Sequence, residues 1–223
     1  MSEKQAHRPY WRVGYRGDPL GFAPWEICEW NHRFDDRRHR FRTVYVAELA
    51  ETALRETLAA FRPKLSAIRR FQQEMGADAA RELASWPIAA AWRNEHVLAP
   101  AQLTLSGPIC DLTDVSQRRT IEEHHAQLLI EHGMRHLDLH EITTSRRVIT
   151  QTIATNLYDE GVAAIRFPSN LDGNPCVAMF EGRGELDQHG AIVALTDPPP
   201  TALLRVTADW QLSLEPATLR PSS

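Results

Sequence analysis

The chain has few cysteines and no long apolar segment. Its three cysteines, Cys28, Cys110 and Cys176, form no CxxC pair, so the sequence predicts neither a disulfide framework nor a cysteine zinc site. It contains no apolar run of about 18 residues, the length that a membrane-spanning helix needs. The first residues, MSEKQAHRPYWR, include no apolar signal-peptide region. We therefore expect a soluble, unexported, cytoplasmic protein without a membrane partner.

An excess of basic charge and the common nucleotide-binding motifs are also missing. The chain carries 25 Lys and Arg against 29 Asp and Glu, whereas nucleic-acid binding needs clustered basic excess. No direct nucleic-acid partner is expected. GxGxxG, GxxxxGK[ST], GxSxG and HExxH motifs are absent from the sequence. Among the histidines, His124 and His125 are adjacent and would point about 100° apart on a helix, so no metal site is predicted.

The length and apolar content suit one folded domain. The chain has 223 residues, of which 43% are hydrophobic, enough to bury a substantial core. We expect this domain over residues 10–215, between a flexible N-terminus at 1–9 and a flexible tail at 216–223. Strand and helix patterns are interspersed without regular βαβ units, so the sequence predicts a compact α+β fold with mixed strands and flanking helices.

Hydrophobic periodicity places the main elements. The apolar residues Ala53, Leu54 and Leu58 fall on one face of a helix predicted over residues 50–61. The other predictions are strands at 11–15 and 43–47, helical or mixed structure at 64–93, a strand pair at 96–114, helices at 116–132 and 145–160, a strand at 136–143, a strand–turn–strand at 162–180, and one or two strands within 191–216.

Three segments share a pattern with a known family. They supply Arg33 followed by Phe34, the strand residues 45–47, the run 52–56 that ends in Glu56, and 167–169 followed by Phe180. In this order and spacing they resemble the RES family, the toxin half of certain bacterial toxin–antitoxin pairs. Together with the segments WPIAAAWRNEHVLAP, CDLTD and TQTIATNLYDEG, the resemblance covers roughly residues 10–182.

The resemblance implies a domain similar to the ADP-ribosyltransferase fold that takes NAD as its substrate, without a metal. It further implies a growth-inhibiting enzyme that cleaves the nicotinamide–ribose bond and is neutralised by a small Xre-like helix-turn-helix antitoxin. Two other functions stay open: ADP-ribosylation of a protein target, and a catalytically idle module that binds only nucleotide or partner. Formation of a homo-oligomer also stays open.

Four residue types suit this substrate. Cleavage passes through an oxocarbenium-like sugar, and nicotinamide leaves as a neutral ring, so one carboxylate can suffice. Glu56 would hold the ribose hydroxyls and stabilise the cation. Arg33 would bind the phosphates through its planar fork. Tyr45, placed at the end of its strand, would stack on nicotinamide, and Ser169 would donate a hydrogen bond to a ribose or phosphate oxygen.

Each of these residues also has an ordinary structural interpretation. Glu56 could be a solvated glutamate on a helix flank, Tyr45 a core aromatic, and Ser169 a turn residue. Arg33 belongs to the basic run HRFDDRRHRFR, which is typical of a solvated loop. Its rivals as phosphate ligands are Arg12, Arg16 and Arg37.

The residue at position 54 gives information about the group that accepts ADP-ribose. Many protein-modifying ADP-ribosyltransferases carry Glu or Gln two residues before the catalytic Glu, and this chain has Leu54 there. Leu54 lies on the apolar stripe and is predicted to face the core. This favours water or phosphate as the acceptor over a protein.

Overall fold

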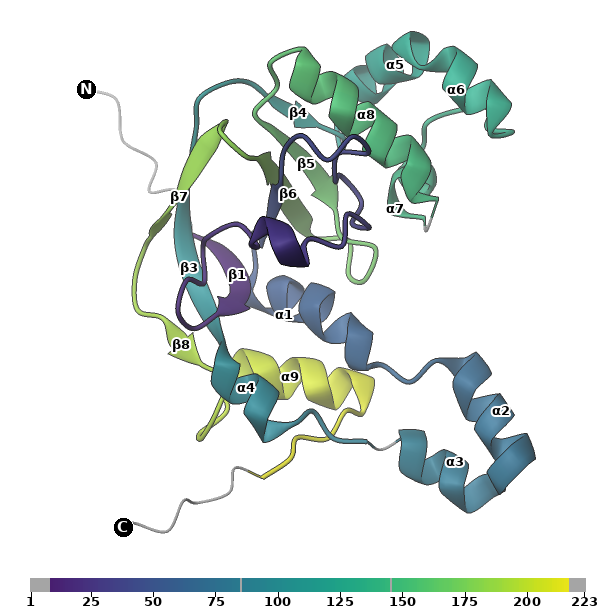
Figure 1. Cartoon of the computed structure of the whole chain (residues 1–223), viewed down its shortest axis with the longest axis vertical. Helices are drawn as coiled ribbons and strands as arrows, with labels where there is room; N and C mark the ends of the chain where they lie inside the picture. The colour runs from purple at the N-terminus through teal and green to yellow at the C-terminus, as the bar shows by residue number, and fades with distance from the viewer. Residues whose placement is uncertain (1–8, 85, 145, 217–223) are drawn as a thin grey trace.

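The computed structural model describes residues 9–84, 86–144 and 146–216 (Figure 1). Of the segments predicted to be flexible, all but Pro9 and Pro216 lie outside these residues. The strands are β1 (Tyr10–Tyr15), β2 (Thr43–Ala47), β3 (His96–Leu105), β4 (Ile109–Asp111), β5 (Ala164–Pro168), β6 (Pro175–Phe180), β7 (Gly184–Gln188) and β8 (Val193–Ala194). The helices are η1 (Trp25–Ile27), α1 (Ala50–Leu58), η2 (Ala59–Phe61), α2 (Leu65–Met75), α3 (Ala77–Ala84), α4 (Ala90–Glu95), α5 (Val115–His124), α6 (Ala126–Glu131), α7 (Leu139–Thr143), α8 (Arg147–Asp159) and α9 (Thr201–Trp210).

The strands form one eight-stranded mixed sheet, which confirms the predicted α+β fold. The strand order is β4-β5-β6-β2-β1-β3-β7, and β8 pairs with β3. Only β4 and β5 run parallel among these pairs. β2 pairs with β6 along its whole length, but it meets β1 at a single residue pair, Trp11 opposite Ala47. The sheet therefore opens between β1 and β2, and α1 lies beside this opening (Figure 1).

The two faces of β2 belong to different parts of the core. Val44 and Val46 are buried in a small cluster with Met179 of β6, and apolar residues of β3 and β7 pack against it. Tyr45 and Ala47 face the opposite side, where the larger core lies. This alternation has the period of two expected of a strand. It turns Tyr45 toward the face that the helices cover.

Helices cover the larger core in two groups (Figure 1). α8 buries Ile149, Ile153 and Leu157 in the cluster that also contains residues of β5 and β6. α1 and α9 pack on each other, and α1 also packs on β1. α2 and α3 pack together and extend away from the sheet. No helix in the described part of the chain is long and apolar enough to cross a membrane.

The predicted strand at 136–143 is wrong, because this segment contains the short helix α7. The alternation of Leu137 and Leu139 suggested a strand, but Leu137 is buried while Leu139 is 40% exposed. Ile142, three residues after Leu139, is the second buried position. The inward-facing residues therefore do not alternate, and the segment has the geometry of a single helical turn.

Three other predictions need correction. The helix predicted over 116–132 is divided into α5 and α6 at His125. β3 and β4 do not pair with each other, because they lie toward opposite ends of the sheet order. The C-terminal segment predicted as strands contains β8 but is mainly α9, which begins after Pro200 and buries Leu203 and Val206. This spacing of three residues is helical.

Candidate functional site

Glu56 and Ser169 come together although 113 residues separate them along the chain. α1 buries Leu54 and Leu58, so Glu56 lies on its exposed side. Ser169 is buried in the turn between β5 and β6. Its hydroxyl donates a hydrogen bond to Oε1 of Glu56 at 2.6 Å, so the serine proton that was predicted for a ligand is used to hold the carboxylate. The second carboxylate oxygen has no hydrogen-bond partner among the described residues.

The same turn is attached to α1 by a second acid. Thr52 donates to Oδ2 of Asp172 at 2.8 Å, and Nε of Arg55 lies 3.6 Å from the same oxygen. Within the turn, the backbone N–H of Leu171 donates to the Ser169 hydroxyl at 3.1 Å. Three side chains of α1 therefore contact one six-residue turn, which fixes the position of Ser169 relative to Glu56. Sequence reasoning missed Asp172, which only its place three residues after Ser169 could have suggested.

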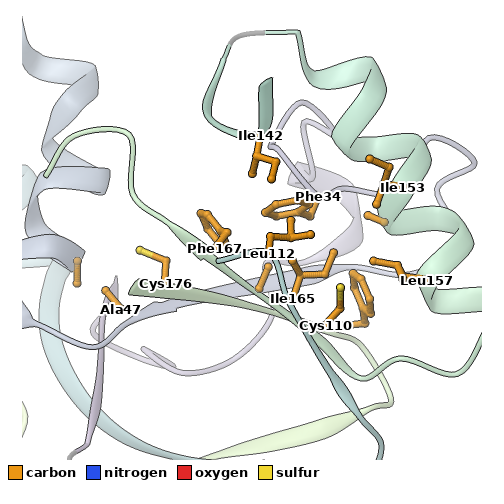
Figure 2. Packing of buried hydrophobic residues seen from close by; sticks show 14 of the residues in the cluster. Phe34, Ala47, Cys110, Leu112, Ile142, Ile153, Leu157, Ile165, Phe167 and Cys176 are labelled. Atoms are coloured by element: carbon orange, nitrogen blue, oxygen red, sulfur yellow. The ribbon is translucent and has the colours of Figure 1, made fainter. Parts of the chain in front are cut away.

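Arg33 is held by its neighbour Phe34. Phe34 is fully buried and lies next to Ile142 and Phe167 in the core (Figure 2), and its ring centroid is 4.8 Å from that of Phe167. This packing brings the Arg33 guanidinium to the C-terminal end of α7. There it donates to the carbonyl oxygens of residues 142, 143 and 144.

Tyr45 lies in the middle of β2, which corrects the prediction that it ends the strand. Its hydroxyl oxygen accepts a hydrogen bond from the backbone N–H of Phe34 at 2.9 Å. The ring centroid is 5.8 Å from that of His32 and 6.3 Å from that of Phe167. Burial, followed by the charge of Asp35, raises the pKa of Tyr45 well above its usual value. Tyr45 is thus a neutral, half-buried phenol beneath the Arg33 loop.

Electrostatic effects connect these residues. Burial lowers the pKa of Arg33, and the charge of Glu56 is the largest effect opposing this shift. Burial also raises the pKa of the Cys176 thiol on β6, and Glu56 is the second cause. Against the larger effect of burial, the charge of Arg33 acts to lower the pKa of Tyr45. Glu56 therefore interacts electrostatically with Arg33, and Arg33 with Tyr45.

The rival arginines have structural partners. Arg12 donates to the carbonyl oxygens of Pro19 and Gly21, and burial lowers its pKa to about 10. Arg16 donates to the carbonyl oxygen of Asn94 at 2.8 Å. Arg37 donates to the hydroxyl of Thr152, on α8, at 3.4 Å. None of these four contacts joins an arginine to Glu56, Ser169 or Tyr45.

The sequence analysis also did not single out Arg147, which is the first residue of α8. Only three positions along the chain separate it from Thr144, whose carbonyl oxygen accepts a hydrogen bond from Arg33. The predicted helix at 145–160 located this residue on a helix start, but nothing in the sequence indicated that α8 begins beside Arg33. Within the described residues, no group of three or more His, Cys, Asp or Glu could hold a metal ion.

Comparison with known protein families agrees with the resemblance seen in the sequence. No curated protein matches the chain. The chain is similar to a chain of a solved structure, the MbcT–MbcA toxin–antitoxin complex of M. tuberculosis. The superposition covers 90% of this chain and 89% of that chain. The two share 12% identity and superpose with a TM-score of 0.49, so this likeness carries no argument about function. The RES domain matches residues 9–213, and this match spans nearly the whole chain. The chain therefore belongs to the RES family.

Proposed function

We propose that this protein cleaves the bond between nicotinamide and ribose in NAD. The observation that carries the proposal is the contact between Ser169 and Glu56, which holds one carboxylate at the opening beside β2. Its second oxygen is uncommitted among the described residues. A single oriented carboxylate that interacts with the charge of Arg33 matches the needs of this reaction. Membership of the RES family supports the same substrate.

The chemistry needs little from the protein beyond charge and orientation. The bond from the anomeric carbon to nicotinamide breaks, and its electron pair neutralises the departing pyridinium, so the leaving group needs no proton. Glu56 accepts hydrogen bonds from the ribose hydroxyls and stabilises the positive charge that develops on the sugar. An interaction of this kind contributes roughly 10²- to 10³-fold to the rate. Ser169 holds the carboxylate, and the half-buried Tyr45 ring offers a surface on which nicotinamide stacks.

Two acceptors can complete the reaction. Attack of water on the anomeric carbon gives ADP-ribose and a proton, and attack of phosphate gives a phosphorylated ADP-ribose. Leu54 is fully buried, as its place on the apolar stripe predicted, so it cannot orient the side chain of a protein acceptor. This burial favours a small acceptor. ADP-ribosylation of a protein is the second candidate. Glu56 is exposed on α1, so a protein acceptor could approach it from solvent.

We also propose a biological role for this activity, as a growth-inhibiting toxin that an antitoxin neutralises. The RES family resemblance supports this role, and an antitoxin that covers the opening beside β2 would block entry of NAD. In this proposal the protein acts in the cytoplasm, where NAD is available. Co-expression with an antitoxin candidate should restore growth if the role is correct.

The first experiment measures NAD consumption and nicotinamide release by the purified protein, with and without inorganic phosphate. Release without any protein acceptor supports cleavage with transfer to water or phosphate. Release that appears only when a protein acceptor is added, with labelled ADP-ribose on that acceptor, supports the second candidate. If no NAD is consumed under any of these conditions, both enzymatic functions are rejected, and a catalytically idle binding module is the remaining function.

A further inference from the structure

The donors of Arg33 are largely occupied by the protein. A guanidinium has five N–H donors, and Arg33 uses three of them on the carbonyl oxygens of residues 142, 143 and 144. These carbonyls end α7, where the partial negative charge of a helix favours a cation. Arg33 is also fixed by the burial of Phe34. It therefore connects the loop after residue 31 to α7, and it has few donors left for a dinucleotide phosphate.

A second arginine lies on the same side of the site. Gln151 of α8 donates to the carbonyl oxygens of Trp30 and His32, so this face of α8 lies against the residues that precede Arg33. Arg147 is one turn earlier on the same face of the helix, because residues four apart are neighbours on a helix surface. Its backbone follows closely after Thr144, whose carbonyl oxygen accepts from Arg33 at 3.1 Å. Arg33, through its hydrogen bond to Thr144, and Arg147, through the chain, therefore both lie close to the end of α7.

Arg147 differs from Arg33 in its freedom. It is exposed, and its guanidinium has no hydrogen-bond or ion-pair partner within the part of the chain that the structure describes. Burial lowers the pKa of Arg33, and the charge of Arg147 acts in the same direction. Two cations side by side repel each other, and an anion between them would relieve this repulsion. The site therefore has a cationic edge with one free, fork-shaped donor.

We propose that Arg147 makes the main contact with the pyrophosphate of NAD, while Arg33 is a positioning residue that holds its loop against α7. This assignment rests on the proposed function, since it names the group that anchors the same substrate. The guanidinium of Arg147 matches phosphate oxygens in a two-pronged contact. With the pyrophosphate held by Arg147, the nicotinamide end of the substrate would lie toward Tyr45 and Glu56.

The test compares two neighbouring arginines. Arg147→Gln removes the proposed contact, and Arg147→Lys keeps the charge but not the fork. Arg146→Gln is the matched control, because Arg146 is exposed and its guanidinium lies 3.3 Å from the carbonyl oxygen of His132 instead. Both Gln variants change the net charge equally. We measure kcat and KM for NAD, and the Kd of ADP-ribose, which carries the pyrophosphate but lacks the scissile bond.

We expect Arg147→Gln to raise the KM for NAD and the Kd of ADP-ribose by about tenfold or more, the effect of losing a hydrogen bond to a charged group. The change in kcat should be smaller, Arg147→Lys should recover part of the loss, and Arg146→Gln should resemble the native protein. Arg33→Ala should lower the melting temperature, because it frees α7. Equal KM and Kd values for the two Gln variants would overturn the assignment.

The ADP-ribose measurement separates this assignment from the proposed reaction. If the native protein binds ADP-ribose but does not consume NAD, the proposed cleavage fails, and the loss of binding in Arg147→Gln still supports the pyrophosphate contact. If the native protein consumes NAD but Arg147→Gln binds ADP-ribose as Arg146→Gln does, the contact is wrong and the cleavage stands. Absence of both activities would overturn both proposals.

Discussion

Replacement of Ser169 with alanine tests how the protein orients its carboxylate. The change removes the 2.6 Å hydrogen bond to Oε1 of Glu56 and the acceptor of the Leu171 N–H. A hydrogen bond to a charged group is worth about 1.5–3 kcal/mol, and every 1.36 kcal/mol corresponds to about tenfold in rate. If the whole loss affects the transition state, kcat/KM for NAD should fall by about 10- to 150-fold.

The assay is nicotinamide release at varied NAD, accompanied by thermal unfolding of the same preparations. Ser106→Ala is the control, because Ser106 is an exposed serine in the connection between β3 and β4, away from α1. The fall in kcat/KM should appear in Ser169→Ala and not in the control, with a melting temperature shifted by only a few degrees. Unchanged kinetics in a folded Ser169→Ala protein would refute the argument that Ser169 holds Glu56.

Two further predictions concern the surroundings of the site. Asp172→Ala removes the partner of Thr52 and Arg55, so we expect unfolding to become easier by about 1–3 kcal/mol in thermal denaturation and kcat to fall with it. A variant that melts with the native protein would contradict this role of the turn. Burial opposes the ionisation of Asp36, but hydrogen bonds, with that from Thr155 the largest, outweigh it and lower its pKa below the usual 3.8. The Asp36 carboxylate therefore stabilises the fold above that value, and this contribution is lost as the pH falls through the lowered pKa. The unfolding free energies of the native protein and Asp36→Asn should thus differ at neutral pH and converge in acid, and a difference independent of pH would contradict the argument.

The sequence predicted secondary structure correctly where local periodicity and tertiary contacts agree. The stripe of Ala53, Leu54 and Leu58 predicted α1, and these residues are buried. The turn residues at 168–175 predicted the connection between β5 and β6. Both predictions concern neighbours in the chain, where side-chain spacing and turn chemistry determine the structure.

Predictions failed where local signals were short or polar. β7, with the sequence GELDQ, has no buried residues and no apolar alternation, so only its pairing with β3 makes it a strand. α9 carried a helical spacing in Leu203 and Val206, but the preceding prolines suggested an extended segment. Proline before the first helical turn is compatible with a helix, since that turn needs no N–H partner.

The site itself depends on contacts that no local pattern contains. The bond from Ser169 to Glu56 joins α1 to a distant turn, and Arg33 reaches carbonyls more than a hundred residues away in sequence. α7, which supplies those carbonyls, was predicted as a strand, so the structural role of Arg33 could not be foreseen. Arg147 lies near the site because α8 begins four residues after the end of α7, and no local pattern in the sequence indicates this. Residue types and their order suggested the chemistry, and tertiary structure divides the roles among the arginines.

The most direct test of the proposed function is the rate of nicotinamide release by Glu56→Gln. The substitution keeps the size of the side chain and an oxygen that can accept from Ser169, but it removes the charge that would stabilise the oxocarbenium-like sugar. We expect kcat for NAD cleavage to fall by about two orders of magnitude or more, while the melting temperature stays close to that of the native protein because Glu56 is exposed. A folded Glu56→Gln protein that releases nicotinamide at the native rate would contradict the assignment of Glu56 as the catalytic carboxylate.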